Sequence, residues 1–438
     1  MNRRPSGCLL LFFVLTEYRT LNLSYDFYAP GRITFGWGQR SELTSIVAEH
    51  GTRVFVVSGS RTLEASGQLG ELIGQVKSGG FDCEHVTTIS HEPEVADVDN
   101  LVADLVRRGA GVGDCLVAIG GGSAIDLAKA AAALVPNRES ATVKDYLEGV
   151  GAGLTIDIPP LPLIAMPTTA GTGTEATKNA VISSYDPAFK KSLRSPLMIP
   201  NAVLIDPELS IGLSPATTAY TGMDAITQLL ESLISNRAQP IPQALCLQGL
   251  ALAIPAIVEA VENGSSRLAR EAMAHAALLS GLALANSGLG MAHGVAAALG
   301  VHAKVPHGLA CAVMLLVTLR TNRDVALPQL AQAGRTMKQV ILGSALSDSE
   351  TRLIAQDSNF GHDDEAADFA IQIVRSLCHR IGIPTTLTQL GVSVEQLPAI
   401  VTSSRGNSMS GNPRKLSGDE LMNVLRNMTD SHCEQADV

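Results

Sequence analysis

The sequence has few aromatic residues and no long run of basic ones. Aromatic side chains make up only 4% of the 438 residues, whereas glycine and alanine are abundant. That composition favours closely packed helices and glycine turns over a β-sandwich. The formal net charge is −10, so no basic surface for phosphate backbones is indicated. We therefore expect no nucleic-acid partner and no binding to an anionic membrane.

Paired cysteines are also absent. The seven cysteines are odd in number, scattered along the chain and never spaced as CxxC. This pattern is typical of reduced, buried thiols, and we expect a cytoplasmic protein. The same scatter argues against a structural zinc site built on cysteines.

No hydrophobic run makes a convincing membrane span. The apolar run CLLLFFVL (8–15) follows two arginines, but it is short for a signal peptide and no A-x-A-type cleavage site follows it. Cys8 precedes this run, which argues against a lipoprotein anchor. We expect residues 1–23 to be a disordered or over-long start, with the fold beginning near Ser24.

Strand-like and helix-like segments alternate through the first half of the chain. Apolar runs ending in glycine, proline or hydroxyl residues occur at 53–59, 114–123, 161–175 and 202–209. Helical stretches follow the first two runs. The alternation predicts a mostly parallel sheet covered by helices on both faces.

The second half of the chain has a different pattern. After Pro207, alanine- and leucine-rich stretches have helical spacing and β-branched runs become rare. No internal repeat or low-complexity tract is present. We expect an α/β domain over residues 24–207 and an all-helical domain over residues 208–438.

A glycine-rich segment, GGGSAIDLAK (120–129), follows a predicted strand and opens a predicted helix. Backbone N–H groups at such a helix start bind phosphate when no side chain obstructs them. Ser123 is expected to cap the helix, and Asp126 lies in its first turn. The alternative is a tight capped turn with no ligand, and this segment alone does not decide between the two.

A second loop, PTTAGTGTEAT (167–177), also follows a predicted strand and is rich in threonine and glycine. Its hydroxyls and amides could line the same anionic ligand as the first loop. The usual dinucleotide fingerprint GxGxxG is absent. Two such loops in an open sheet nevertheless favour a nucleotide site at the carboxyl ends of the strands.

The second half contains polar residues in apolar helical stretches. TGMDAITQLLES (221–232) places Asp224 and Gln228 four residues apart, on one face of a predicted buried helix. His293 lies in another helical stretch, and His307 begins a third. A carboxylate and two imidazoles that converge across helices would make a divalent metal site.

Each of these residues also has an ordinary structural interpretation. A single histidine is more often a core or surface residue than a ligand. Asp224 alone would suit the amino-terminal part of a helix, where the helix dipole favours a carboxylate. The combination with two phosphate-type loops is what favours a metal site.

The order and spacing of the motifs resemble the iron-containing (group III) alcohol dehydrogenase family, part of the dehydroquinate synthase-like superfamily. The resemblance implies a Rossmann-like NAD(P)-binding domain followed by an all-helical metal-binding domain. It implies a metal-dependent alcohol dehydrogenase or aldehyde reductase that passes hydride between a nicotinamide and a small alcohol or aldehyde. The matching segments are GRITFGWG (31–38), GGGSAIDLAK, PLIAMPTTAGTGTEAT, KKSLRSPLMIP (190–200), LIDPEL, TGMDAITQLLE, GLGMAHGVAAALG (288–300), VPHG and NPRK (412–415).

The resemblance also implies the metal ligands, with two departures. The family has an Asp, a His four residues later and two further His, and the matching positions here are Asp224, Gln228, His293 and His307. Gln228 would be a weaker ligand than imidazole for Fe²⁺ or Zn²⁺, or it would contact the metal through water. The family's relay histidine is replaced here by Ala297.

The cofactor positions implied by the resemblance surround the two loops. Some of these residues are expected to contact the pyrophosphate, some to line the cofactor between adenine and nicotinamide, and some to contact the nicotinamide ribose. The expected residues are Gly59, Ser60, Gly121, Gly122, Ser123, Asp126, Thr168, Thr169, Thr172 and Lys190. No acidic residue follows the strand at 53–59, and Ser60 and Arg61 could bind a 2′-phosphate. NADP is therefore favoured over NAD, unless Arg61 is merely a solvated residue at a helix start.

Two alternatives stay open. A metal-independent reductase resembling the maleylacetate reductases would use His293 or His307 as proton donor or oxyanion partner. A non-catalytic nucleotide-binding member would explain the departures at Gln228 and Ala297. Retention of Asp224 with both histidines favours the metal-dependent enzyme. The resemblance further implies a homodimer or higher homo-oligomer and leaves the identity of the substrate open.

Overall fold

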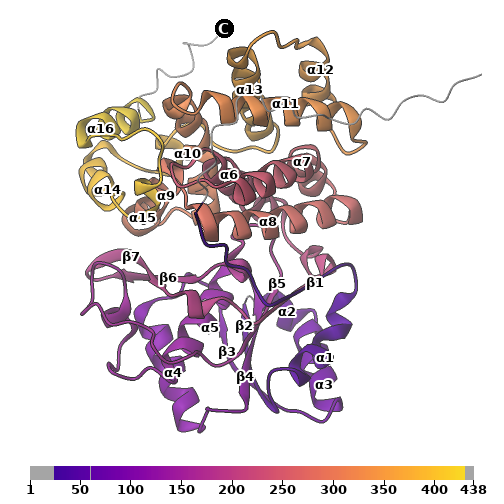
Figure 1. The fold of residues 1–438 in the computed structure, drawn as a ribbon, viewed down its shortest axis with the longest axis vertical. Coiled ribbons are helices and arrows are strands. Elements are labelled where there is room, and N and C mark those ends of the chain that lie inside the picture. The colour runs from indigo at the N-terminus through magenta and orange to yellow at the C-terminus, as the bar shows by residue number, and fades with distance from the viewer. Residues whose placement is uncertain (1–23, 60, 430–438) are drawn as a thin grey trace, which may run out of the picture.

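The computed structural model describes residues 24–59 and 61–429 and has two parts, one above the other in Figure 1. The lower part contains the sheet and the upper part is helical. The predicted disordered start over residues 1–23 lies outside the described residues. Five cysteines are described, and all five are free and buried, as predicted for them.

A six-stranded parallel sheet in the order β1-β8-β5-β4-β2-β3 forms the centre of the lower part. It confirms the predicted α/β fold class. The edge strands β1 and β3 were not predicted, because their side chains are only partly buried and lack a continuous apolar run. The strands are β1 (Arg32–Phe35), β2 (Arg53–Gly59), β3 (Asp82–Ile89), β4 (Asp114–Gly120), β5 (Leu163–Pro167) and β8 (Ala202–Ile205).

Helices cover both faces of the sheet. Successive side chains of a strand point to opposite faces. Phe55 and Val57 of β2 therefore pack with α4 and α5, while Val54 and Val56 pack with α1 and α3. The helices of this part are α1 (Leu43–Ala48), α2 (Arg61–Ala65), α3 (Gln68–Ser78), α4 (Val95–Arg107) and α5 (Gly122–Leu134).

A separate antiparallel hairpin, formed by β6 (Asn179–Tyr185) and β7 (Ala188–Arg194), was not predicted. Strand β7 contacts helix α9 of the upper part. The hairpin thus carries Lys190 from the α/β part to the helical part, which matters for the site.

The upper part is all-helical, as predicted. The last sheet strand ends at Ile205 and α6 begins at Pro215, so the predicted domain boundary at residue 207 lies between them and stays a prediction. The helices are α6 (Pro215–Ile234), α7 (Pro240–Glu262), α8 (Arg267–Ser287), α9 (Met291–Ala303), α10 (His307–Asn322), α11 (Leu327–Gly343), α12 (Ser349–Asp357), α13 (Asp363–Arg380), α14 (Leu397–Ser403), α15 (Asn407–Ser410) and α16 (Gly418–Asn427).

Helix α7 is long and apolar enough to cross a membrane by length and composition. However, 56% of its most apolar window is buried in the protein, and α7 packs against α6 and α8. Helices α8 and α9 pass the same test only as a pair bent by 101°. Burial in the bundle accounts for the apolar composition of α7.

The two parts touch backbone to backbone at a pair of glycines. Gly173, after β5, has a φ of 59°, and Gly281 lies in α8. A Cβ on Gly281 would lie only 2.1 Å from the carbonyl oxygen of Gly173. The loop after β5 therefore rests directly on α8, and no side chain fits between them.

Candidate functional site

The strand order reverses between β2 and β4, where a parallel sheet opens a crevice for ligands. The chain runs from β2 to β3 on one side and returns to β4 on the other. Gly59 and Gly120 end these two strands and lie against each other, since a Cβ on Gly120 would be 2.7 Å from the Gly59 nitrogen. Only glycine permits this approach, which leaves backbone amides open at the crevice.

Helix α5 begins at this crevice without a side-chain cap. Its N-cap residue is Gly121, and Ser123 lies inside the helix. The prediction that Ser123 caps the helix was wrong, because the extended Gly121 takes the cap position two residues earlier, and Asp126 therefore lies beyond the first turn and not in it as predicted. Helix α5 is 13 residues long, and its uncapped start fits a phosphate group.

The second glycine- and threonine-rich loop packs on the first. A Cβ on Gly122 would lie 2.8 Å from the Thr172 methyl group, and one on Gly121 would lie 3.3 Å from Thr169. The Thr168 N–H donates to the Gly120 carbonyl oxygen at 3.0 Å. The structure therefore brings the two predicted loops together at one edge of the sheet.

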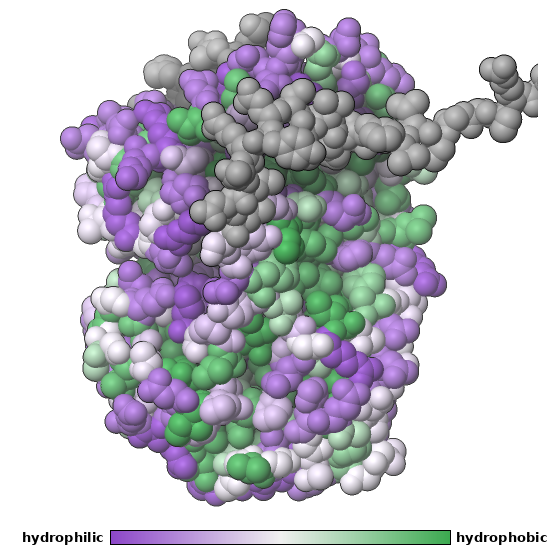
Figure 2. Space-filling view, in the orientation of Figure 1, coloured by the Kyte–Doolittle hydropathy of each residue, from purple (hydrophilic) through white to green (hydrophobic). Residues whose placement is uncertain are grey.

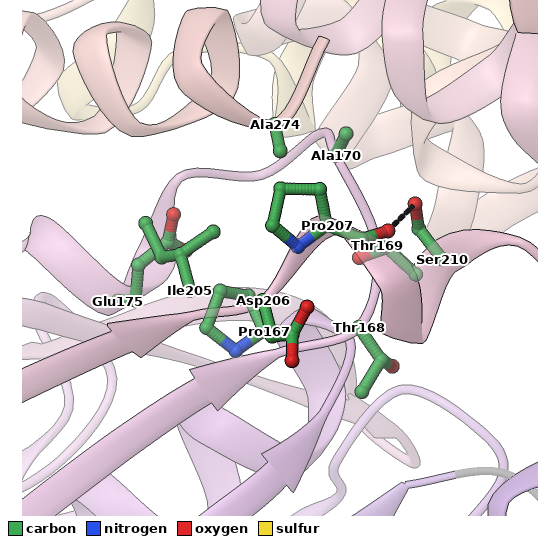
Figure 3. Close-up of a pocket in the computed structure, with 10 residues that line it drawn as sticks. All are labelled: Pro167, Thr168, Thr169, Ala170, Glu175, Ile205, Asp206, Pro207, Ser210 and Ala274. Carbon is green, nitrogen blue, oxygen red and sulfur yellow. Dashed lines mark hydrogen bonds between the residues drawn. The ribbon is translucent and has the colours of Figure 1, made fainter. Parts of the chain in front are cut away.

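A small pocket lies where β5 and β8 end beneath α8 (Figure 3). Thr168 and Thr169 line it together with Asp206 and Ser210. The Asp206 carboxylate accepts hydrogen bonds from the backbone N–H groups of Gly38, at 3.0 Å, and Arg40, at 3.2 Å. With a volume of about 10 Å³, the pocket has room for about one water molecule and none for a nicotinamide.

Asp126 holds the chain that follows the second loop. Its carboxylate accepts from the Thr174 hydroxyl and, at 3.0 Å, from the Val181 N–H. Both oxygens are thus engaged within the protein, and a contact of Asp126 with the cofactor stays a prediction. The neighbouring Lys129 is buried and donates to the carbonyl and hydroxyl of Thr174 at 2.8 and 2.7 Å.

Four buried or partly buried side chains from three helices converge in the upper part. Asp224 comes from α6, His293 from α9, and His307 and Cys311 from α10. One potential ligand atom from each lies within 4.8 Å of the others, so they could hold one metal ion. We call these four residues the ligand group. His293 Nε2 lies 3.1 Å from Asp224 Oδ1, and the two imidazole rings are 5.5 Å apart.

Glu231 orients one of these imidazoles. It lies on α6 two helical turns after Asp224, is fully buried, and lies 2.6 Å from His293 Nδ1. It also accepts from the Ala292 N–H at 2.6 Å, at the start of α9. Because a carboxylate accepts only, His293 Nδ1 carries the hydrogen and Nε2 faces the ligand group.

Gln228 has different partners. Its Nε2 donates to the Thr172 carbonyl oxygen at 3.1 Å, and its Oε1 accepts from the Ser280 hydroxyl at 2.7 Å. These bonds direct the amide toward the second loop and α8. They also tie α6, one turn after Asp224, to the loop that packs on Gly122.

Burial and neighbouring charge set the protonation of the ligand group. Burial opposes ionisation of Asp224, but the hydrogen bond with His293 and the nearby His307 lower its pKa. Burial disfavours the imidazolium of His293, yet Cys311, Asp224 and Glu231 raise its pKa well above the usual value. Burial and then the charge of Lys190 lower the pKa of His307 to about 4. A neutral His307 has a lone pair available for a metal.

Lys190 approaches the ligand group from the hairpin. Its ammonium lies 2.7 Å from Glu92 Oε1, and 3.8 Å from the place where a Cβ on Gly300 of α9 would be. Ser60 and the side chain of Arg61 lie outside what the structure describes. The predicted contacts that favour NADP therefore stay a prediction.

The chain is similar over nearly its whole length to enzymes of known activity. It is 30% identical over 406 residues to the sulfoacetaldehyde reductase of Bilophila wadsworthia, covering 92% of this chain and 98% of that protein. Its fold is similar to a crystal structure of 1,3-propanediol oxidoreductase, with a TM-score of 0.82, 27% identity, and coverage of 93% of this chain and 100% of that one.

A third relative carries a cofactor. The structure of sulfoacetaldehyde reductase from Bifidobacterium kashiwanohense in complex with NAD⁺ has a TM-score of 0.77 and 26% identity, covering 93% of this chain and 100% of that one. These relatives define the class of this protein as an oxidoreductase acting on CH–OH groups.

Both parts of the chain match the same family. Residues 30–207 match the iron-containing alcohol dehydrogenase family, and residues 218–429 match the Fe-containing alcohol dehydrogenase family, C-terminal. The chain belongs to the iron-containing alcohol dehydrogenase family, as its motifs predicted. The ligand group lies in the helical part, within the residues that match the C-terminal family.

Proposed function

We propose that the protein is a metal-dependent and NAD(P)-dependent alcohol dehydrogenase or aldehyde reductase acting on a small substrate. The observation that carries this proposal is the hydrogen bond between Gln228 and the Thr172 carbonyl. It ties the helix of Asp224 to the loop on the open start of α5. A phosphate-binding loop and a buried ligand group are thereby held side by side across the seam between the two parts.

The crevice residues fit a dinucleotide. Gly59, Gly121, Gly122 and Ser123 lie at the uncapped helix start, and Thr169 and Thr172 of the second loop lie beside it. Gly122 has no room for a side chain beside Thr172, so the backbone is what a pyrophosphate would meet. Lys190 lies on the ligand-group side, where the ribose next to the nicotinamide is expected. NADP is favoured over NAD on the sequence after β2.

The ligand group fits a divalent metal, Fe²⁺ or Zn²⁺. Asp224, His293 and His307 would hold it, and Glu231 would keep the His293 ring in place. A metal bound there would act as a Lewis acid on the substrate oxygen. Ala297 has no proton to pass, so the proton would have to travel through water, a cofactor ribose hydroxyl or a nearby side chain such as Lys190.

One observation favours a second candidate, a metal-independent reductase. Burial disfavours protonation of His293, but Cys311 and the carboxylates of Asp224 and Glu231, between which the ring lies, raise its pKa. An imidazolium at this position could itself donate a proton to the substrate oxygen. Removal of metal separates the two candidates, because only the first would lose turnover.

Several broader properties belong to the same proposal. We place the protein in the cytoplasm, because its described cysteines are free and buried. A homodimer or higher homo-oligomer is favoured, since hydrophobic residues gather around the junction of the two parts on the face in Figure 2. Light scattering of the purified chain measures that state. The α/β and helical domains are taken as 24–207 and 208–438.

The experiment is a turnover assay of the full chain, stripped of metal and then reloaded with Fe²⁺ or Zn²⁺. Small aldehydes are supplied with NADPH or NADH, and cofactor oxidation is measured. We expect turnover only in the reloaded protein, and a loss of at least about 100-fold in Asp224→Asn. The exposed change Asp419→Asn is the control and should leave the rate unchanged. Full turnover in metal-free protein would favour the second candidate instead.

A further inference from the structure

Gln228 occupies the position of the second metal ligand in the family, but its hydrogen bonds leave it poorly placed to bind a metal here. Gln228 donates to the Thr172 carbonyl and accepts from Ser280, so both ends of its amide are engaged. Turning its oxygen toward Asp224 would give up both hydrogen bonds and release the second loop from α6. The residue at this position thus serves the contact between the two parts.

Cys311 lies where a fourth ligand is needed. It is one helical turn after His307 on α10, so both side chains lie on the same face of that helix. Its sulfur is 3.7 Å from His307 Nε2 and belongs to the ligand group with Asp224 and His293. The side chain is fully buried.

Other buried cysteines of the chain have ordinary apolar surroundings. Cys246 and Cys378 lie in the hydrophobic core of the helical part, where a thiol acts as a small hydrophobe. Cys311 belongs to the same core, but its sulfur also lies among a carboxylate and two imidazoles. This difference sets it apart from a residue that only fills space.

A second observation at the same place points to a missing partner. His307 Nδ1 is buried and has no hydrogen-bond partner among the described residues. Buried polar atoms are nearly always paired, and an unpaired one marks a position for an ion or water. His307 therefore has a ring nitrogen open to a bound group, and its other nitrogen, Nε2, lies beside the Cys311 sulfur.

We propose that the Cys311 thiolate is the fourth protein ligand of the metal in this chain, in place of Gln228. This inference rests on the proposed function, which supplies the metal. On binding, the thiol loses its proton to solvent and a sulfur–metal bond forms. One carboxylate, two imidazoles and one thiolate make a softer set than the predicted oxygen and nitrogen ligands. Such a set favours Zn²⁺ over Fe²⁺.

The test uses Co²⁺ as a spectroscopic probe in the metal-stripped full chain. A thiolate bound to Co²⁺ gives intense charge-transfer absorption in the near ultraviolet, which oxygen and nitrogen ligands do not give. We expect one Co²⁺ per wild-type chain with this absorption. Cys311→Ser should lose the absorption and bind Co²⁺ and Zn²⁺ at least about 10-fold more weakly. Cys246→Ser, an equally buried thiol, is the matched control and should keep both.

The possible outcomes separate this inference from the proposed function. One Co²⁺ per wild-type chain without charge-transfer absorption overturns the role of Cys311 and leaves the metal-dependent enzyme standing. No bound Co²⁺, Zn²⁺ or Fe²⁺ in the wild-type chain overturns both. If Cys311→Ser does not fold, X-ray absorption spectroscopy of the zinc-loaded wild-type protein decides whether a sulfur atom is bound to the metal. A sulfur neighbour at about 2.3 Å supports the inference, and its absence overturns it.

Discussion

Two groups of buried ionisable residues lie in this protein, and they differ in how their polar atoms are satisfied. Around Lys129 in the lower part, the ammonium donates to carbonyls and hydroxyls of Thr174 and Thr177, and Asp126 accepts from its own neighbours. In the ligand group, atoms that could bind a metal ion converge, and His307 Nδ1 has no hydrogen-bond partner among the described residues. Burial of charge alone therefore does not mark a functional site, whereas several potential metal ligands that face one another do.

The largest effect expected from this comparison is on stability. Lys129→Met should lower the free energy of unfolding by about 4 kcal/mol, because it leaves Asp126 and several carbonyls without their partner. Chemical denaturation measures the loss, with the exposed change Lys77→Met as control. Metal content per folded chain should not change. A variant with normal stability but less bound metal would reverse the roles of the two regions.

The buried carboxyl group of Glu175, near Lys129, should make the stability of the protein depend on pH. Burial raises the pKa of Glu175 to about 7 from its ordinary 4.5. Between these values the folded chain keeps a proton that the unfolded chain has released, so wild-type stability falls as pH rises through this window. Relative to wild type, Glu175→Gln should gain stability from pH 4.5 upward, reaching about 3 kcal/mol at pH 8.

Unfolding of both proteins across that pH range checks this. The two should have nearly equal stability below pH 4.5, where the carboxyl is neutral in both states. A difference that stays flat with pH would show that Glu175 has the same pKa in the folded and the unfolded chain.

A smaller effect is expected behind the ligand group. Glu231→Gln keeps an acceptor for the Ala292 N–H but removes the charge that faces His293. Metal affinity should fall by about 10- to 100-fold, with little loss of stability. Competition with a metal chelator measures the affinity, and the exposed change Glu64→Gln is its control. Unchanged affinity in Glu231→Gln would mean that packing alone holds the ring.

The inner architecture was predictable because its signals are local. The strands at 53–59 and 114–120 and the helix after them follow from apolar runs closed by glycine. The hairpin β6–β7 and the edge strands escaped because their partly buried residues show no such run. The cap position of Gly121 was not predicted, because Ser123 is also a residue type preferred at helix N-caps.

The candidate site was predictable in part. Asp224, His293 and His307 stood out as polar residues in apolar helices. Glu231 and Cys311 did not, although each follows a predicted ligand at helical spacing, by seven and four residues. That spacing could have identified both, but which of the polar residues face one another depends on how three helices cross. No local pattern contains that information.

The contact between Gly173 and Gly281 has a mechanical consequence. The two parts meet there with no side chain between them, so the spacing of the crevice is set by two backbones in direct contact. An added methyl group at Gly281 would act as a wedge and push the second loop away from α8. Since that loop also accepts from Gln228, the wedge would pull on the helix of Asp224. One methyl group would thus change the alignment of both halves of the site.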